Sequence, residues 1–101
     1  MVNEITDQTF EELTKEGKVL VDCFATWCGP CRMLSPIIDA LAEENKDYKF
    51  YKLDVDNSNE VVKKYGVMSI PCLILFEDGK EIDRSIGFKP KDQIESFLGD
   101  N

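Results

Sequence analysis

The chemistry most accessible to this sequence comes from two cysteines separated by two residues, in the stretch Trp27-Cys28-Gly29-Pro30-Cys31. In a regular helix, side chains three positions apart hold their Cβ atoms roughly 5 to 6 Å apart, whereas a disulfide requires about 3.5 to 4.5 Å. The two thiols can therefore reach each other only where the helix is not yet regular. We expect Cys28 to lie at or just before the start of a helix, where it can pair reversibly with Cys31.

The residues around this pair predict a strand that leads directly into a helix. Pro30 suits the first helical position, because its missing N–H would have no partner there, and Gly29 allows a tight approach. Residues 18–25 form an apolar run that only Asp22 interrupts after the initial lysine, as expected for a strand buried on both faces. After the pair, apolar side chains recur at the spacing of an amphipathic helix: Met33, Leu34, Ile37, Ile38 and Leu41.

This placement predicts which thiol reacts first. Unpaired N–H groups and the helix dipole stabilise negative charge at a helix N-terminus, so the thiolate of Cys28 is favoured there and its nucleophilicity is raised. We expect Cys28 to be exposed at the helix end, with Cys31 one turn further in. Cys28 is therefore the predicted nucleophile.

Two metal-binding interpretations of the cysteines remain open. A zinc site would need more ligands, and the sequence has no histidine and no second C-x-x-C. The spacing of Cys23, Cys28 and Cys31, with the distant Cys72, fits the C-x4-C-x2-C…C pattern of plant-type ferredoxins. Against an iron–sulfur cluster, Cys23 lies inside the predicted strand, where successive side chains face opposite sides, while a cluster needs a loop that wraps its thiolates inward.

Length and charge limit the class of protein. A chain of 101 residues can bury one core, so we expect residues 1–101 to form a single domain. Its net charge of −8 argues against nucleic acid or an anionic membrane as a partner. The N-terminal residues show no signal-peptide pattern and no apolar run is long enough to span a membrane, so we expect a cytoplasmic protein.

The rest of the chain alternates predicted strands and helices and then changes order. Asp78-Gly79 is a hairpin signal, which makes the last two strands antiparallel. Further strands are predicted at residues 2–5, 49–55, 72–76 and 81–86. One further helix is predicted at 9–15, with a Thr9–Glu12 capping box and Gly17 at its end, and another at 58–65, between an Asn57 or Ser58 cap and Gly66. The last helix should begin at Pro90, with Ile94, Phe97 and Leu98 facing inward.

The complete WCGPC sequence after a strand that carries an aspartate resembles the thioredoxin family, and the resemblance runs from about Val2 to Leu98. It implies an α/β fold with three α/β/α layers and a mixed five-stranded sheet in the order βαβαβαββα. It also implies a protein disulfide reductase in which Cys28 attacks a substrate disulfide and Cys31 resolves the mixed disulfide. Electron transport and cell redox homeostasis are the corresponding roles.

The same resemblance implies roles for residues around the dithiol. Asp22, with Lys52 nearby, would accept the proton of Cys31 through water. The Ile70–Pro71 peptide bond would be cis, and the backbone of the loop that ends there would bind an extended segment of the partner. The implied apolar binding surface consists of Trp27, Gly29, Pro30, Val55, Met68, Ile70, Pro71, Gly87 and Phe88.

Electrons must come from another protein, because none of the six glycines forms the G-x-G-x-x-G pattern of a dinucleotide site. The resemblance implies no cofactor, a separate thioredoxin reductase that is NADPH- or ferredoxin-linked, disulfide-containing substrate proteins, and a monomer. A structural module with the same fold but no turnover is the alternative from another class. The chain departs from the common family pattern at Cys23 and Cys72. We expect Cys23 to be a structural thiol, whereas Cys72, close to the active site, is open between a structural and a regulatory role.

Overall fold

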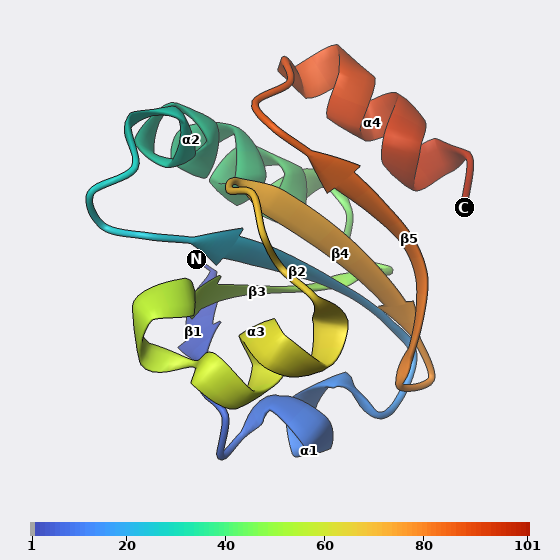
Figure 1. Ribbon diagram of the computed structural model, residues 1–101. Coiled ribbons are helices and arrows are strands. Elements are labelled where there is room, and N and C mark those ends of the chain that lie inside the picture. Colours follow the sequence, from blue (N-terminus) through green and yellow to red (C-terminus); the bar gives the residue numbers. More distant parts are fainter. Residues whose placement is uncertain (1) are drawn as a thin grey trace.

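The computed structural model describes residues 2–101 and has a five-stranded sheet between two layers of helices (Figure 1). Helices α2 and α4 cover one face of the sheet, and α1 and α3 cover the other. The elements in order are β1 (Asn3–Ile5), α1 (Phe10–Thr14), β2 (Lys18–Phe24), α2 (Gly29–Glu44), β3 (Lys49–Asp54), the 3-10 helix η1 (Val55–Asn57), α3 (Asn59–Tyr65), β4 (Cys72–Glu77), β5 (Lys80–Ile86) and α4 (Lys91–Gly99).

The strand order is β1-β3-β2-β4-β5, so β2 occupies the centre of the sheet. It pairs in parallel with β3 and antiparallel with β4. The outer pair β1–β3 is parallel, while β4–β5 is an antiparallel hairpin. The expected mixed sheet and the order of elements are confirmed. The strand that precedes Cys28 is thus held by hydrogen bonds on both sides.

Successive residues of β2 point into two different cores. On the side of α1 and α3, Val21 belongs to a core in which the rings of Phe10 and Tyr65 lie 5.3 and 5.2 Å from that of Phe76. On the side of α2 and α4, Leu20 packs in a separate, mainly aliphatic core. The alternation that defines a strand therefore decides which layer each residue of β2 faces. The members of the second core are Val2, Leu20, Leu34, Ile38, Leu41, Phe50, Leu73, Leu75, Ile94 and Leu98.

Two helix starts differ from the sequence-based expectation. The predicted capping box at Thr9 does not form: its Oγ1 instead accepts a hydrogen bond from the backbone N–H of Thr6 at 3.0 Å. At α3, Ser58 is the N-cap residue, but the carboxylate of Asp7 accepts the backbone N–H groups of Glu60 and Val61 at 3.2 and 3.0 Å. A distant acidic side chain therefore caps this helix, which the local sequence does not reveal.

The turns agree more closely with expectation. Asp78 and Gly79 both have positive φ, 51° and 86°, as a two-residue hairpin turn requires. Gly66 ends α3 with a φ of 62°. Pro90 is the N-cap residue of α4 and not part of its first turn, since its ψ of 164° is extended.

Candidate active site

The strand-to-helix junction brings Cys28 and Cys31 together. Cys28 is the N-cap residue of α2, with an extended ψ of 111°, and Pro30 follows in the first turn. The two cysteines form a disulfide with their Cα atoms 5.3 Å apart. The Sγ of Cys28 also accepts the backbone N–H of Cys31 at 3.3 Å. The sulfur of Cys28 therefore lies where the helix N-terminus stabilises negative charge.

The expectation that Cys28 is exposed is wrong for the disulfide form. Cys28 is 5% exposed and Cys31 is 4% exposed, so accessibility does not distinguish them. The disulfide turns both sulfur atoms toward each other, and Ala25 and the half-buried Ile70 pack around them. The difference between the two thiols comes instead from the N-cap position of Cys28.

Gly29 does not have the steric role that we expected. Apart from its chain neighbours and the adjacent helix backbone, a Cβ built on Gly29 would meet no heavy atom of the described residues within 4 Å, and its φ is not in the left-handed region. Nothing within residues 2–101 therefore requires glycine there, and the space over the residue is open. Pro30 lies in the first turn of α2, but Gly29 is the first helical residue, so Pro30 lies one position later than predicted.

Asp22 and Lys52 are direct neighbours in the parallel register of β2 and β3. Asp22 is buried, and burial raises the pKa of its carboxyl to about 7, although Lys52 lowers it and Asp39 raises it further. Within residues 2–101, its Oδ1 finds no hydrogen-bond partner. The Nζ of Lys52 lies 5.9 Å from the ring centroid of Phe24. A buried acid that titrates near neutral pH is suited to exchange protons.

A pocket of about 250 Å³ connects Asp22 with Cys31. Its lining is mostly apolar, but its volume and the polar side chains in its wall can accommodate water between the carboxyl and the sulfur. Its wall also contains Thr26, Arg32 and Ser35, which no sequence motif marks as site residues. One internal contact among them is the hydrogen bond from Nη1 of Arg32 to the carbonyl of Thr26 at 2.9 Å.

The loop from α3 to β4 closes over the disulfide. The Ile70–Pro71 peptide bond is cis, which confirms the expectation. Ile70 and Val55 are half-buried and pack against Cys28 and Cys31. The carbonyl of Pro71 accepts the N–H of Gly87 at 2.8 Å, and Gly87 has a φ of 90°. The loop before β4 is thus tied to the end of β5.

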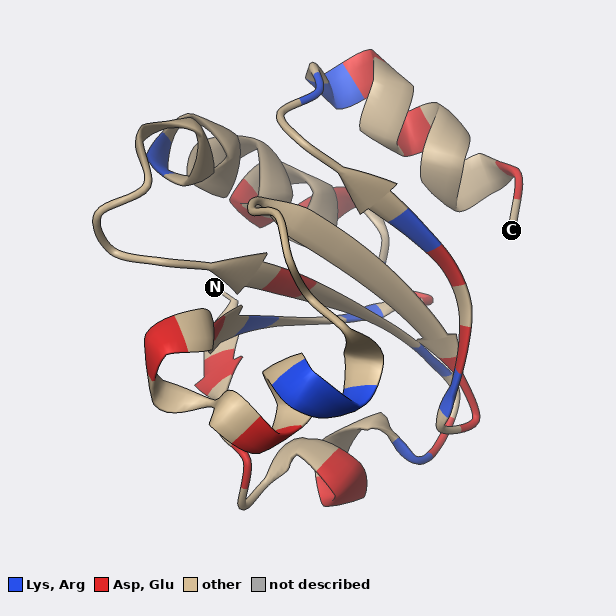
Figure 2. Ribbon diagram, viewed as in Figure 1, with Lys and Arg blue, Asp and Glu red and all other residues tan. Residues whose placement is uncertain are grey.

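Uncharged loops and exposed apolar side chains surround the disulfide. Residues 25–28 and 67–71 contain no charged side chain, although the chain carries a net charge of −8 (Figure 2). Trp27 is 67% exposed, and its Nε1 donates to Oδ2 of Asp56 at 2.8 Å. Asp56 was not identified from the sequence, because only the fold brings it to the indole. The other exposed apolar residues of the expected surface are Met68 and Phe88.

The remaining cysteines form a second pair within the sheet. Cys23 and Cys72 lie directly opposite each other in the β2–β4 register, and both are free thiols. Burial is the main cause that raises the pKa of each thiol. The described residues contain no cluster of three or more His, Cys, Asp or Glu side chains arranged to hold a metal ion. The four cysteines thus divide into two pairs and do not converge on one point.

Comparisons with known proteins agree over almost the whole chain. The family model for thioredoxin matches residues 1–100. A thioredoxin of Listeria monocytogenes is 46% identical over 97% of this chain and 96% of its own length, and one of Bacillus subtilis is 47% identical over 92% and 90%. A chain from a solved structure on the thiol resolving mechanism of yeast mitochondrial 1-Cys peroxiredoxin has a TM-score of 0.90 and 32% identity, covering 99% of this chain and 95% of its own. Within residues 2–101, no helix has the length and apolar character needed to cross a membrane.

Proposed function

This chain belongs to the thioredoxin family, and from that membership we propose how its residues divide the work of reducing disulfides in other proteins. The redox couple is the Cys28/Cys31 dithiol and its disulfide. The observation that carries the assignment is the position of Cys28 at the N-cap of α2, with its sulfur accepting the N–H of Cys31.

Cys28 performs the first step. Its thiolate attacks one sulfur of a substrate disulfide, the substrate S–S bond breaks, and the other substrate sulfur leaves as a thiolate that takes up a proton. The product is a mixed disulfide between Cys28 and the substrate. The helix N-terminus supports this step because it stabilises the attacking thiolate before the reaction begins.

Cys31 performs the second step with Asp22 as proton acceptor. Cys31 loses its proton to the carboxylate through water in the shared pocket and then attacks the sulfur of Cys28. The mixed disulfide breaks, the substrate leaves with both sulfurs reduced, and the Cys28–Cys31 disulfide forms. Since burial raises the pKa of Asp22 to about 7, the carboxylate form is well populated at neutral pH and is still basic enough to accept a proton. Lys52 tunes this acid from the neighbouring strand.

The substrate docks as an extended segment beside the loop that ends at Pro71. Trp27, Met68 and Phe88 supply exposed apolar surface for this segment. The absence of charged residues in 25–28 and 67–71 supports apolar docking there. An added strand gives backbone hydrogen bonds that tolerate many sequences, which suits a reductase of broad specificity. Gly29, Pro30, Val55, Ile70 and Gly87 complete this proposed docking surface.

A separate reductase of the thioredoxin reductase class returns two electrons to the disulfide. The lack of a G-x-G-x-x-G pattern supports an external electron source. We place the protein in the cytoplasm as a monomer. Free Cys23 and Cys72 support this location, because unpaired thiols persist best in a reducing compartment.

Reduction of insulin disulfides tests the proposal. With dithiothreitol or a thioredoxin reductase as electron donor, the wild-type protein should accelerate insulin precipitation, whereas Cys28→Ser should match the rate without protein. A folded wild-type protein with no turnover would show instead a structural module of this fold.

A further inference from the structure

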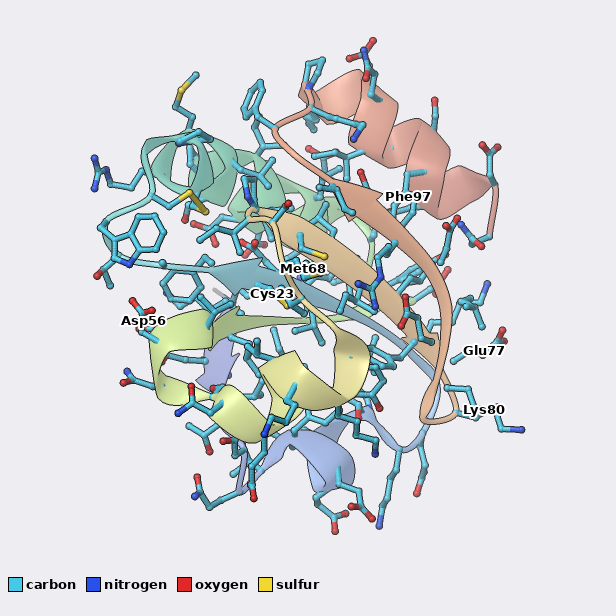
Figure 3. All side chains as sticks on the ribbon, viewed as in Figure 1. Cys23, Asp56, Met68, Glu77, Lys80 and Phe97 are labelled. Carbon is cyan, nitrogen blue, oxygen red and sulfur yellow. A yellow bond between two sulfur atoms is a disulfide. The ribbon has the colours of Figure 1, made fainter. Side chains whose placement is uncertain are left out.

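Two exposed methionines lie on the two segments that carry and cover the disulfide, the helix α2 and the loop before β4. Met33 follows Cys31 by two residues on α2 and is 62% exposed, while Met68 is 94% exposed. Figure 3 labels Met68 on the segment between α3 and β4, in front of the sheet. Such thioethers are apolar, polarisable and open to oxidants in solution. Oxidation of a thioether can therefore be compared at two positions, Met33 on α2 and Met68 before β4.

We propose that Met68 is a modification site for hydroperoxides, and that its oxidation weakens protein docking while the dithiol chemistry stays intact. The thioether sulfur attacks the terminal peroxide oxygen, an S–O bond forms and the O–O bond breaks. The sulfur loses two electrons and becomes a sulfoxide. The proton of the transferred oxygen moves to the leaving oxygen, which departs as water or an alcohol. The effect on docking rests on the proposed function, since it needs the docking surface described above.

The segment around Met68 is fixed at both ends, so its side chain is presented outward. Before it, the N–H of Val67 donates to the carbonyl of Val62 at 3.0 Å. After it, Ile70 packs on the disulfide and Pro71 accepts the N–H of Gly87. A segment held in this way cannot easily withdraw a modified side chain from the surface. A docked apolar segment would have to remove water from the new sulfoxide oxygen, which is unfavourable without a hydrogen-bond partner.

The four cysteine sulfur atoms are protected in the disulfide form of the protein. Cys28 and Cys31 are already paired. Cys23 and Cys72 are 0% and 1% exposed. Peroxide applied to the oxidised protein should therefore reach the exposed thioethers without changing any thiol. Subsequent reduction with dithiothreitol restores an intact dithiol, which allows the docking effect to be measured separately.

The experiment treats the disulfide form with hydrogen peroxide, maps the sulfoxides by peptide mass spectrometry, reduces the protein and measures two activities. Insulin serves as the protein substrate, and glutathione disulfide serves as a small substrate that does not need the docking surface. Oxidation should raise KM for insulin about fivefold, leave kcat nearly unchanged and leave the rate with glutathione disulfide unchanged. Methionine sulfoxide reductase should restore the original KM.

Met33→Leu and Met68→Leu form the matched pair of variants, each compared with its own untreated sample. Met33 lies outside the proposed docking surface, so peroxide should still raise KM in Met33→Leu but have no effect in Met68→Leu. An effect that disappears only in Met33→Leu, or an unchanged KM despite complete sulfoxide formation at Met68, would overturn the inference. If the untreated protein reduces neither substrate, the proposed function itself fails, and the two failures remain distinguishable.

Discussion

The chain contains two pairs of cysteines with opposite settings. Cys28 and Cys31 lie at the junction of β2 and α2 and are joined by a disulfide. Cys23 and Cys72 lie opposite each other in the last residue pair of the β2–β4 ladder and are free. Cys23 and Cys28 are only five positions apart in the sequence. Proximity of two thiols is therefore common to both pairs, and it does not make a redox centre by itself.

The difference lies in what surrounds each sulfur atom. At the helix N-terminus, a backbone N–H points at the sulfur of Cys28. In the sheet, backbone hydrogen bonding is used by the strands, and burial raises the pKa of the Cys23 and Cys72 thiols. Arg84 lowers the pKa of both buried thiols but does not outweigh burial. A thiol at the N-terminal end of a helix is activated, whereas a thiol buried between strands of a sheet is not.

The largest expected effect is the loss of activity when either member of the first pair is replaced. Cys28→Ser should reduce insulin turnover to the uncatalysed background, because no nucleophile remains. Cys31→Ser should still attack but should accumulate a covalent mixed disulfide with substrate. Non-reducing electrophoresis of each variant after incubation with a disulfide substrate measures this. Trapping through Cys31 in the Cys28→Ser variant would reverse the roles of the two thiols.

The second expected effect is selective alkylation of the reduced protein. Iodoacetamide at neutral pH should modify Cys28 orders of magnitude faster than Cys23 or Cys72, since of these three thiols only Cys28 lies at a helix N-terminus that stabilises its thiolate. Peptide mass spectrometry over time gives the three rates. Unfolding in guanidinium should make the rates similar. Comparable rates in the folded protein would show that the sheet does not protect its thiols.

The third expected effect is on the rate of the second step and concerns Asp22. This residue of β2 lines the same pocket as Cys31. Asp22→Asn should slow the second step by about a hundredfold near neutral pH, because Cys31 loses its proton acceptor. In the wild type, the rate of this step should fall as the pH falls below about 7, because Asp22 becomes protonated. The variant should lack that pH dependence. Stopped-flow measurement of mixed-disulfide decay between pH 5 and 9 checks it.

The fourth expected effect is the cost of the same carboxyl to stability. Burial raises the pKa of Asp22 from 3.8 to about 7, so its stabilising contribution is complete below about pH 3.8 and is lost as pH rises through about 7. Asp22→Ala should therefore raise the free energy of unfolding at pH 8 by about 1 to 3 kcal/mol after lost packing is included. The gain should disappear at pH 3.

Urea unfolding of both proteins at pH 3 and pH 8 measures this stability difference. A variant that is less stable at pH 8 and equally fast in disulfide exchange would make Asp22 a structural group. In that case the proton-acceptor role would have to be abandoned. A more stable but slower variant is the expected combination for a residue that serves chemistry at the expense of the fold.

The smallest expected effect on activity comes from replacing the buried pair. Cys72→Thr and Cys23→Phe should each keep insulin turnover within a few-fold of wild type. Cys23→Phe should lower the free energy of unfolding by about 1 to 3 kcal/mol, because its site is fully buried and the ring is larger. Turnover assays and urea unfolding test both variants. Loss of turnover in Cys72→Thr, or a disulfide at Cys72 in the oxidised protein, would give the second pair a redox role.

Much of the fold was predictable because its signals are local. The apolar run of β2, the Asp78-Gly79 turn and the place of Pro30 in the first turn of α2 each depend on neighbouring residues. The same holds for the N-cap position of Cys28, which the spacing of the two thiols already required. By contrast, the cis bond at Pro71 was expected only from the family resemblance.

What escaped prediction depends on contacts between distant segments. The carboxylate of Asp7 caps a helix that begins more than fifty positions later, and Asp56 accepts a hydrogen bond from Trp27, 29 positions away. The sequence around the donor and around the acceptor contains no pattern that predicts such a hydrogen bond. The burial of Cys28 was missed for the same reason, since the loop that covers its sulfur comes from the segment before β4. The face-to-face pairing of Cys23 with Cys72 likewise needed the register of the sheet.

The central position of β2 has a consequence for the synthesis of the protein on the ribosome. This strand pairs with β3 on one side and with β4 on the other, and both neighbours are synthesised after the dithiol. A growing chain therefore displays Cys28 and Cys31 well before their strand can be completed. During that interval the thiols are chemically present but lack the finished helix end and the covering loop. At this stage the two cysteines can be oxidised like any exposed thiols but cannot yet act as a redox couple. A reducing environment must therefore keep the cysteines of the nascent chain reduced.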